Sequence, residues 1–225
     1  MQNDTELKTN YLVPAVDQAI RILLYLAEGG GYTRSLTDIC REVGIHRSKA
    51  FSILDTLAQH GLIKKNSNRK GYMLGPGLLT MAGKMLETLS LPRIAGPVLH
   101  DLARKVGATV TLGMISDDNA YIVAEYLGAP GIGISSPIGR MTPVTYGAHG
   151  KAIAAFLPRA ELEELLEKKE LYFYGRPEKF ARKKLLRELA ECRSKGFAVE
   201  LGDIQQGMNA VAAPILNHEN YPIGY

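Results

Sequence analysis

Residues 34–75 decide how the first part of this chain folds, and they read RSLTDICREVGIHRSKAFSILDTLAQHGLIKKNSNRKGYMLG. Ser35 precedes an apolar-periodic run that stops at Gly44, a residue that tolerates the positive φ common at helix ends. A second run follows, with Ala50, Phe51, Leu54, Leu57 and Ala58 on one face at helical spacing. After Gly61, a basic stretch between two short apolar stretches predicts a β-hairpin. This order predicts a winged helix–turn–helix, which is a DNA-binding module.

The charge of this stretch also favours DNA binding. Residues 34–75 contain eight Lys or Arg and three acids, a net charge of +5, whereas the whole chain has a net charge of only +4. Neutralising phosphates supplies most non-specific affinity for DNA, so a DNA-binding surface concentrates basic residues in this way. A basic excess that serves solubility alone would be spread along the chain.

The candidate DNA contacts lie on the outward face of the second helix and on the hairpin. Small hydrogen-bonding side chains suit base edges, and long basic side chains reach phosphates. Free N–H groups in the first helical turn also suit a phosphate. The hairpin lysines and arginines flank a turn at 66–68, whose tip would lie along the backbone or minor groove. The predicted contacts are Arg34, Arg47, Ser48, Lys49, Ser52, Thr56, Lys64, Lys65, Arg69 and Lys70.

Composition places the chain among ordinary globular proteins. It has 225 residues, of which 46% are apolar and 22% charged, enough for two domains. No apolar run approaches the roughly 20 residues that cross a bilayer, and the N-terminus lacks a secretory pattern, which predicts a cytoplasmic protein. Cys40 and Cys192 are expected as buried reduced thiols rather than as a disulfide. The five histidines show no metal-binding spacing, so no metal or other cofactor is expected.

The remaining segments define the domain organisation. Residues 1–12 are predicted to be a disordered lead-in, and a helix from Pro14 completes a DNA-binding domain over 13–75. Residues 76–91 predict a linker helix with more apolar surface than one packing partner needs, which favours dimerisation; a buried core helix is the alternative. Residues 92–225 predict an α+β domain around one mainly antiparallel sheet that holds a ligand. Its strands are expected at 109–115, 120–126, 132–135, 197–200 and 209–215, and its helices at 93–106, 152–157, 161–168 and 179–195.

Motifs from Val13 to the chain end resemble those of the isocitrate lyase regulator (IclR) family of bacterial transcription factors. In the first half they are VDQA at 16–19, IL at 22–23, GIHRS at 44–48, LxxL at 54–57, GLI at 61–63 and YMLG at 72–75. In the second half they are GKA at 150–152, ELAxxRxxGFA at 188–198 and GxxxVAAP at 207–214. No single motif is decisive, but their order and spacing together are specific.

The resemblance implies a winged helix–turn–helix, a linker helix used in dimerisation and a GAF-like effector domain. Family members bind operator DNA as dimers or paired dimers, and a small metabolite, often an organic or aromatic acid, changes that binding. Repression is the commoner direction of control. Carried over by matching motifs, the effector site comprises Met141, Gly147, Ala148, His149, Gly150, Glu200, Met208 and Ala210.

The local chemistry of these residues agrees in part with that role. A helix that opens at Gly147–Gly150 offers backbone N–H groups to a carboxylate. Glu200 suits a ligand hydroxyl or a water better than a carboxylate. His149 either adds a switchable charge or is simply a packed or exposed histidine. Lys151, one helical step inward, is either part of the pocket or a surface lysine.

Three features depart from the family pattern. His46 stands where relatives usually carry Pro, and Ala210 where they often carry Cys, so helix-start geometry and pocket polarity are expected to differ. The chain stops at Tyr225, where relatives continue for another strand and helix. A truncated sequence is the favoured explanation; otherwise one wall of the pocket is missing or is supplied by a neighbour.

Two other classes of function are alternatives to a transcriptional regulator. An enzyme is not expected, because no Walker loop, dinucleotide fingerprint, HExxH or nucleophile elbow is present. The alternative is an architectural nucleic-acid-binding protein without effector control. Such a protein would bind without regard to sequence, with a steep salt dependence and no response to a ligand.

Overall fold

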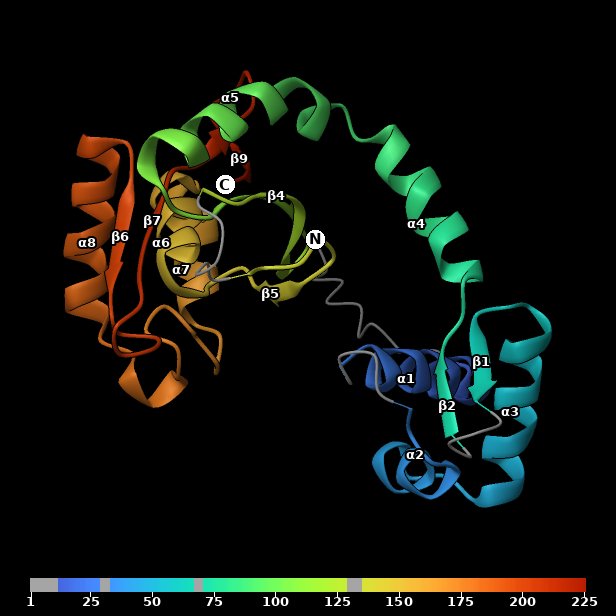
Figure 1. Cartoon of the computed structure of the whole chain (residues 1–225). Helices are drawn as coiled ribbons and strands as arrows, with labels where there is room; N and C mark the ends of the chain where they lie inside the picture. Colours follow the sequence, from blue (N-terminus) through green and yellow to red (C-terminus); the bar gives the residue numbers. More distant parts are fainter. Residues whose placement is uncertain (1–11, 29–32, 67–70, 129–134) are drawn as a thin grey trace, which may run out of the picture. The chain divides into compact units, whose positions relative to one another are not determined.

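The computed structural model describes residues 12–28, 33–66, 71–128 and 135–225. The chain divides into two compact units, one ending at Thr88 and the other starting at Leu89. Figure 1 shows the elements of each unit in chain order. The lead-in (apart from Leu12), the hairpin tip at 67–70 and nearly all of the strand expected at 132–135 lie outside the described residues.

Three helices form the core of the first unit: α1 (Pro14–Glu28), α2 (Leu36–Val43) and α3 (Arg47–Gln59). The Ser35 hydroxyl accepts a hydrogen bond from the Asp38 N–H at 3.1 Å and caps α2. Gly44 ends the helix with a φ of 72°, as its position in the sequence predicted. The helices pack around a cluster of buried apolar residues, which comprises Ile22, Leu26, Ile39, Val43, Leu54, Leu57, Ile63 and Tyr72.

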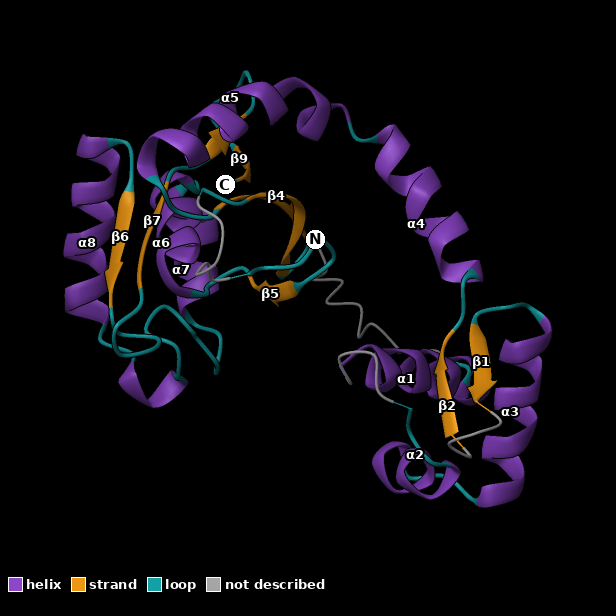
Figure 2. Cartoon of the chain, in the orientation of Figure 1, coloured by secondary structure: helices purple, strands orange, loops and turns teal. Residues whose placement is uncertain are grey.

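A hairpin completes the first unit, as Figure 2 shows. Strands β1 (Ile63–Asn66) and β2 (Gly71–Leu74) pair antiparallel. At the base of the hairpin the backbone of the linker touches the end of α3. A Cβ on Gly75 would lie 2.2 Å from the Gly61 carbonyl oxygen, and the Gly77 N–H donates to that same oxygen at 3.0 Å. The winged helix–turn–helix predicted from the sequence is therefore confirmed.

The linker helix α4 (Gly77–Thr88) contains no buried residue. Its exposed apolar side chains gather on one side, whereas Lys84 and Glu87 form an ion pair at 2.8 Å on the other. The alternative of a buried core helix is therefore wrong for the described chain. The apolar side chains are Leu79, Met81, Met85 and Leu86.

The second unit contains a five-stranded antiparallel sheet in the order β5-β4-β3-β9-β8. Its strands are β3 (Val110–Ser116), β4 (Asn119–Tyr126), β5 (Met141–Pro143), β8 (Ile215–Leu216) and β9 (Pro222–Gly224). Helix α5 (Ser90–Val106) packs on β3 and β4 and runs unbroken through Gly96 and Pro97. Strands β5 and β9 were not expected, because they have three residues each and depend on partners distant in sequence.

The expectation of a single sheet in this unit is wrong. Strands β6 (Ala198–Leu201) and β7 (Asn209–Ala212) pair only with each other among the described residues, with Glu200 opposite Ala210. They form a second, two-stranded sheet because the 202–208 turn folds β7 back on β6. In Figure 1 this sheet lies beside α6 (Gly147–Phe156) and α8 (Arg182–Lys195). Helix α7 (Arg159–Leu166) and a short 3₁₀ helix (Pro177–Lys179) complete the unit.

Helix α6 lies at the centre of this unit. Eight of its ten residues are buried, and it begins at Gly147, the start of the segment where the sequence predicted that a helix opens, and before the range 152–157. A Cβ on Gly150 would lie 2.3 Å from the carbonyl carbon of Thr145, so only glycine fits at this position. The small residues of α6 therefore allow the first helical turn to approach its neighbouring backbone closely.

Candidate DNA interface and effector site

Helix α3 presents the predicted DNA contacts on its outward side. Arg47, Ser48, Lys49, Ser52 and Thr56 are all exposed. The hydroxyls of Ser52 and Thr56 donate to the carbonyls of Ser48 and Ser52, at 3.2 and 2.9 Å. Both bonds remain within the helix, so the hydroxyl lone pairs are available to DNA.

Four basic residues on α3 and β1 have no carboxylate partner among the described residues: Arg47, Lys49, Lys64 and Lys65. Their positive charge is available to phosphates. Arg34 differs, because it is half-buried with its guanidinium 4.8 Å from the centre of the Tyr25 ring. Its backbone also bonds to Tyr72, so it has a structural role. Arg69 and Lys70 lie outside the described residues.

Two expectations about α3 are corrected by the structure. Phe51 was expected on the buried face, but its side chain is 54% exposed. It lies at the edge of that face, since it is about 100° around the helix from Ala50. His46 was expected to alter the start of the helix where relatives carry Pro. Its φ is −68°, the value that a proline would adopt, so the helix starts without distortion.

Ile204 brings together two parts of the predicted effector site. Its backbone N–H donates to Glu200 Oε1 at 3.0 Å. Its side chain covers the start of α6, where a Cβ on Gly147 would lie 3.2 Å from Ile204 Cδ1. Nothing in the sequence singled out Ile204, because its role depends on the fold of the 202–208 turn.

Glu200 is the most unusual residue of this group. It is 1% exposed, and its Oε2 has no hydrogen-bond partner among the described residues. At the start of α6, the N–H groups of Ala148 and His149 likewise have no acceptor in the described chain. The Gly147 N–H donates to the Tyr172 carbonyl at 3.3 Å. The predicted effector residues therefore include two unpaired backbone donors and one buried, unpaired acceptor.

Met141 and His149 are linked through Thr142. The hydroxyl of Thr142 lies 3.1 Å from His149 Nε2, and Met141 is the adjacent, exposed residue of β5. Burial lowers the pKa of His149 to about 4, against a smaller opposing effect of the Pro143 carbonyl. The imidazole is therefore neutral at pH 7, and a charge that switches near neutral pH is not found.

The other predicted effector residues lie along or beside α6 and the β6–β7 turn. Ala148 and Gly150 are buried within the first turn of α6. The Met208 carbonyl accepts from the Gly202 N–H at 3.0 Å and closes the 202–208 turn, while its side chain is half-buried. Ala210 lies opposite Glu200 in the register and is exposed.

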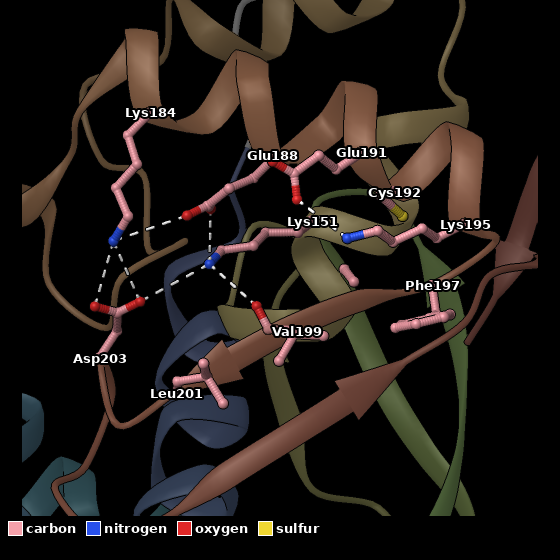
Figure 3. Close-up of a pocket in the computed structure, with 11 residues that line it drawn as sticks. Lys151, Lys184, Glu188, Glu191, Cys192, Lys195, Phe197, Val199, Leu201 and Asp203 are labelled. Carbon is pink, nitrogen blue, oxygen red and sulfur yellow. Dashed lines mark hydrogen bonds and ion pairs between the residues drawn. The ribbon is translucent and has the colours of Figure 1, made fainter.

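A cavity of about 340 Å³ lies between α8 and β6, and none of the eight predicted effector residues lines it (Figure 3). Lys151 is instead among its lining residues and is 1% exposed, so the surface-lysine alternative is wrong. Lys151 Nζ lies 2.9 Å from Glu188 Oε2. A charged residue within an otherwise small and apolar helix was the available signal in the sequence.

The two cysteines are both free. Cys192 is buried in α8, as expected, and burial raises the pKa of its thiol. Cys40 in α2 is only half-buried. No helix of the described chain has both the length and the apolar character of a membrane span.

A winged helix–turn–helix joined by a linker helix to an α+β ligand-binding domain defines a regulatory DNA-binding protein. The family description "Bacterial transcriptional regulator IclR C-terminal" matches residues 83–224, and "IclR helix-turn-helix domain" matches residues 15–67. The chain belongs to the IclR family of bacterial transcriptional regulators, and its second unit is the GAF-like effector domain of that family.

Individual relatives support this assignment. The HTH-type transcriptional regulator XynR of Escherichia coli is 30% identical over 93% of this chain and 82% of its own length. The transcriptional repressor IclR of the same organism is 24% identical over 93% of this chain and 77% of its own length.

Solved structures show the same fold. A regulator from Alicyclobacillus acidocaldarius superposes with a TM-score of 0.81, at 26% identity, over 95% of this chain and 86% of the other. An IclR homologue from Microbacterium hydrocarbonoxydans, solved in complex with 4-hydroxybenzoate, gives a TM-score of 0.74 at 19% identity, over 93% of this chain and 86% of the other.

Proposed function

We propose that this transcriptional regulator binds operator DNA through α3 and the hairpin as a homodimer, and that a hydroxylated organic or aromatic acid bound beside α6 changes that binding. Repression is the proposed direction, as in the relative described as a transcriptional repressor. The proposed site comprises the first turn of α6, Glu200 and the turn that follows it.

The unpartnered Oε2 of Glu200 is the observation that supports this proposal most directly. A carboxylate oxygen that is buried without a donor costs free energy, so the site favours a molecule that supplies one. A hydroxyl group is such a donor. The Ala148 and His149 N–H groups at the positive end of α6 suit a carboxylate. The 4-hydroxybenzoate bound to the Microbacterium relative has both groups.

The DNA-binding half of the proposal rests on exposed and unneutralised positive charge. Arg47 and Lys49 lie in the first turn of α3, and Lys64 and Lys65 lie on β1. Phe51, exposed on the flank of α3, adds an apolar group that suits a thymine methyl. The arrangement supports base contacts from α3 and phosphate contacts from the hairpin.

Dimerisation is supported by the unpartnered apolar stripe of α4. Two copies that pair through α4 would present two α3 helices to two half-sites of an operator, which is how two-fold regulators read palindromic DNA. Pairing of such dimers into a tetramer is the larger assembly that the family resemblance implied.

The effector proposal is tested by a thermal-shift screen with small organic and aromatic acids. The screen includes 4-hydroxybenzoate and benzoate, which lacks the hydroxyl group and serves as the matched comparison. An acid present at 100 times its Kd stabilises the native state by about 2.7 kcal/mol. We expect the hydroxylated acids to raise Tm in the wild type and to do so less in Glu200→Gln. Glu191→Gln, a change of the same kind on the surface of α8, is the control.

Operator binding by fluorescence anisotropy, with and without the stabilising acid, completes the test. We expect the acid to change operator affinity and to leave affinity for random DNA unchanged. Equal affinity for both DNAs, with a steep salt dependence and no response to any acid, would instead identify an architectural DNA-binding protein.

A further inference from the structure

Lys151 is a lysine in the interior of the second unit. It lies on α6 one helical turn after Gly147, and only 1% of its surface is exposed. Burying an ammonium group is costly unless charged or polar partners surround it. The identity of those partners therefore indicates what the side chain holds in place.

The ion-pair and hydrogen-bond partners of Lys151 come from α8, β6 and the 202–208 turn, as Figure 3 shows. Its Nζ lies 2.9 Å from Glu188 Oε2 on α8 and donates to the Val199 carbonyl on β6 at 3.5 Å. It also lies 3.9 Å from Asp203 Oδ2 in the 202–208 turn. The ammonium is 4.6 Å from the centre of the Tyr174 ring, and the Tyr174 hydroxyl donates to Glu188 Oε2 at 3.1 Å.

Two of these partners are the chain neighbours of Glu200, the proposed effector acceptor, and of Ile204, which is hydrogen-bonded to it. Val199 immediately precedes Glu200, and Asp203 immediately precedes Ile204. Within the turn, the Ile204 N–H donates to Glu200 Oε1, and the Ile204 side chain covers Gly147. Helix α6 therefore meets this turn at two places, through Gly147 at its start and through Lys151 one turn later.

We propose that Lys151 is a positioning residue, which holds the Glu200–Ile204 turn against the first turn of α6. Its ammonium holds Val199, just before Glu200, and Asp203, just before Ile204, so that Glu200 Oε2 and the α6 N–H groups face the same ligand. The role of this arrangement in effector binding rests on the proposed function. The restraint on the turn is present in the protein without ligand, so it can be measured separately.

Lys184 supplies a matched comparison. It approaches the same two carboxylates, at 3.8 Å from Glu188 and 3.5 Å from Asp203, and lies over the same Tyr174 ring. It does so from α8, its side chain is 42% exposed, and among the described residues it makes no hydrogen bond to Val199. Lys179 donates to the Asp203 carbonyl at 2.7 Å from an exposed position. Neither lysine links the turn to α6.

The test is hydrogen exchange of the Ile204 amide, measured by NMR in the protein without ligand. The variant is Lys151→Met with Glu188→Gln, since the second change removes the buried carboxylate that Lys151→Met would leave unpaired. We expect the Ile204 amide to exchange about tenfold faster than in the wild type, the factor that one charge-assisted hydrogen bond provides. Glu188→Gln alone and Lys184→Met should retain wild-type protection of this amide.

Unchanged protection of Ile204 in the double variant would overturn the proposal. Equal loss of protection at Ile204 and throughout α8 would overturn it too, because Lys151 would then be a general core contact. The outcome does not depend on an effector being known. If no acid in the thermal-shift screen stabilises the protein, the proposed function is contradicted, but the result of the exchange measurement is unaffected.

Discussion

The imidazole of His149 stacks on the ring of Tyr225, with ring centroids 4.3 Å apart and planes 15° apart. Tyr146 flanks the same imidazole at 5.8 Å, and Thr142 bonds to its Nε2. Burial raises the pKa of Tyr225 to about 12, as it lowers that of His149. The aromatic stack thus holds both groups in their neutral forms across the physiological range.

This stack predicts a pH dependence of stability. The folded pKa of His149, about 4, lies below its ordinary value of 6.5. The unfolded chain therefore binds the proton more readily, and stability present above pH 6.5 is lost as the pH falls towards 4. The shift corresponds to roughly 3 kcal/mol. His149→Phe keeps a ring without titrating, so urea unfolding should show a smaller loss over this window; an equal loss would contradict the assignment.

The proposed base contacts from α3 and phosphate contacts from β1 predict different effects on DNA binding. Arg47→Ala should weaken specific binding by about 1–3 kcal/mol and affect random DNA less. Lys65→Ala should weaken both and reduce the salt slope by about 1. Titrations of operator and random DNA at several salt concentrations separate the two effects. If both variants lose equal affinity for both DNAs, α3 does not read bases.

The close approach at Gly150 predicts a position that does not tolerate a methyl group. Gly150→Ala places a Cβ against the Thr145 backbone and should destabilise the second unit by about 1–3 kcal/mol. Gly83→Ala adds the same methyl to α4, where nothing lies within 4 Å, and should stabilise that helix by up to about 1 kcal/mol. Calorimetric unfolding of both variants measures the contrast, and a neutral Gly150→Ala would show that the Thr145 backbone moves freely.

The apolar stripe of α4 predicts where dimers form. Met85→Glu puts a charge into the stripe, where the side chain is 59% exposed in the single chain, and should shift the protein towards monomer. Lys84→Glu changes charge on the opposite face and should leave assembly unchanged. Sedimentation velocity distinguishes the two. A Met85→Glu variant that sediments like the wild type would place the dimer interface elsewhere.

Local signals in the sequence were sufficient for the first unit. Ser35 and Gly44 act through hydrogen bonds and a backbone angle within a few residues, so α2 could be placed from the sequence alone. Phe51 was wrongly predicted to be buried, because hydrophobic periodicity shows which side of a helix is buried more reliably than how far around the helix the burial extends. Strands β5 and β9 escaped prediction since their partners lie far away along the chain.

The proposed effector site was less predictable. Family resemblance and the small residues at the start of α6 identified candidates, whereas the links between them depend on Ile204 and Thr142, which carry no sequence signal of their own. The sequence leaves two alternatives open for Lys151, because its partners Glu188 and Asp203 lie 37 and 52 positions further along the chain.

The three glycines at the base of the hairpin have a mechanical consequence. Because Gly75 and Gly77 meet Gly61 backbone to backbone, no rotatable side chain separates the end of α3 from the start of α4. A rotation of α4 about its own axis would therefore rotate α3 with it. A rotation of α4 caused by a bound effector would in this way change the orientation of α3, because close-packed contacts transmit strain.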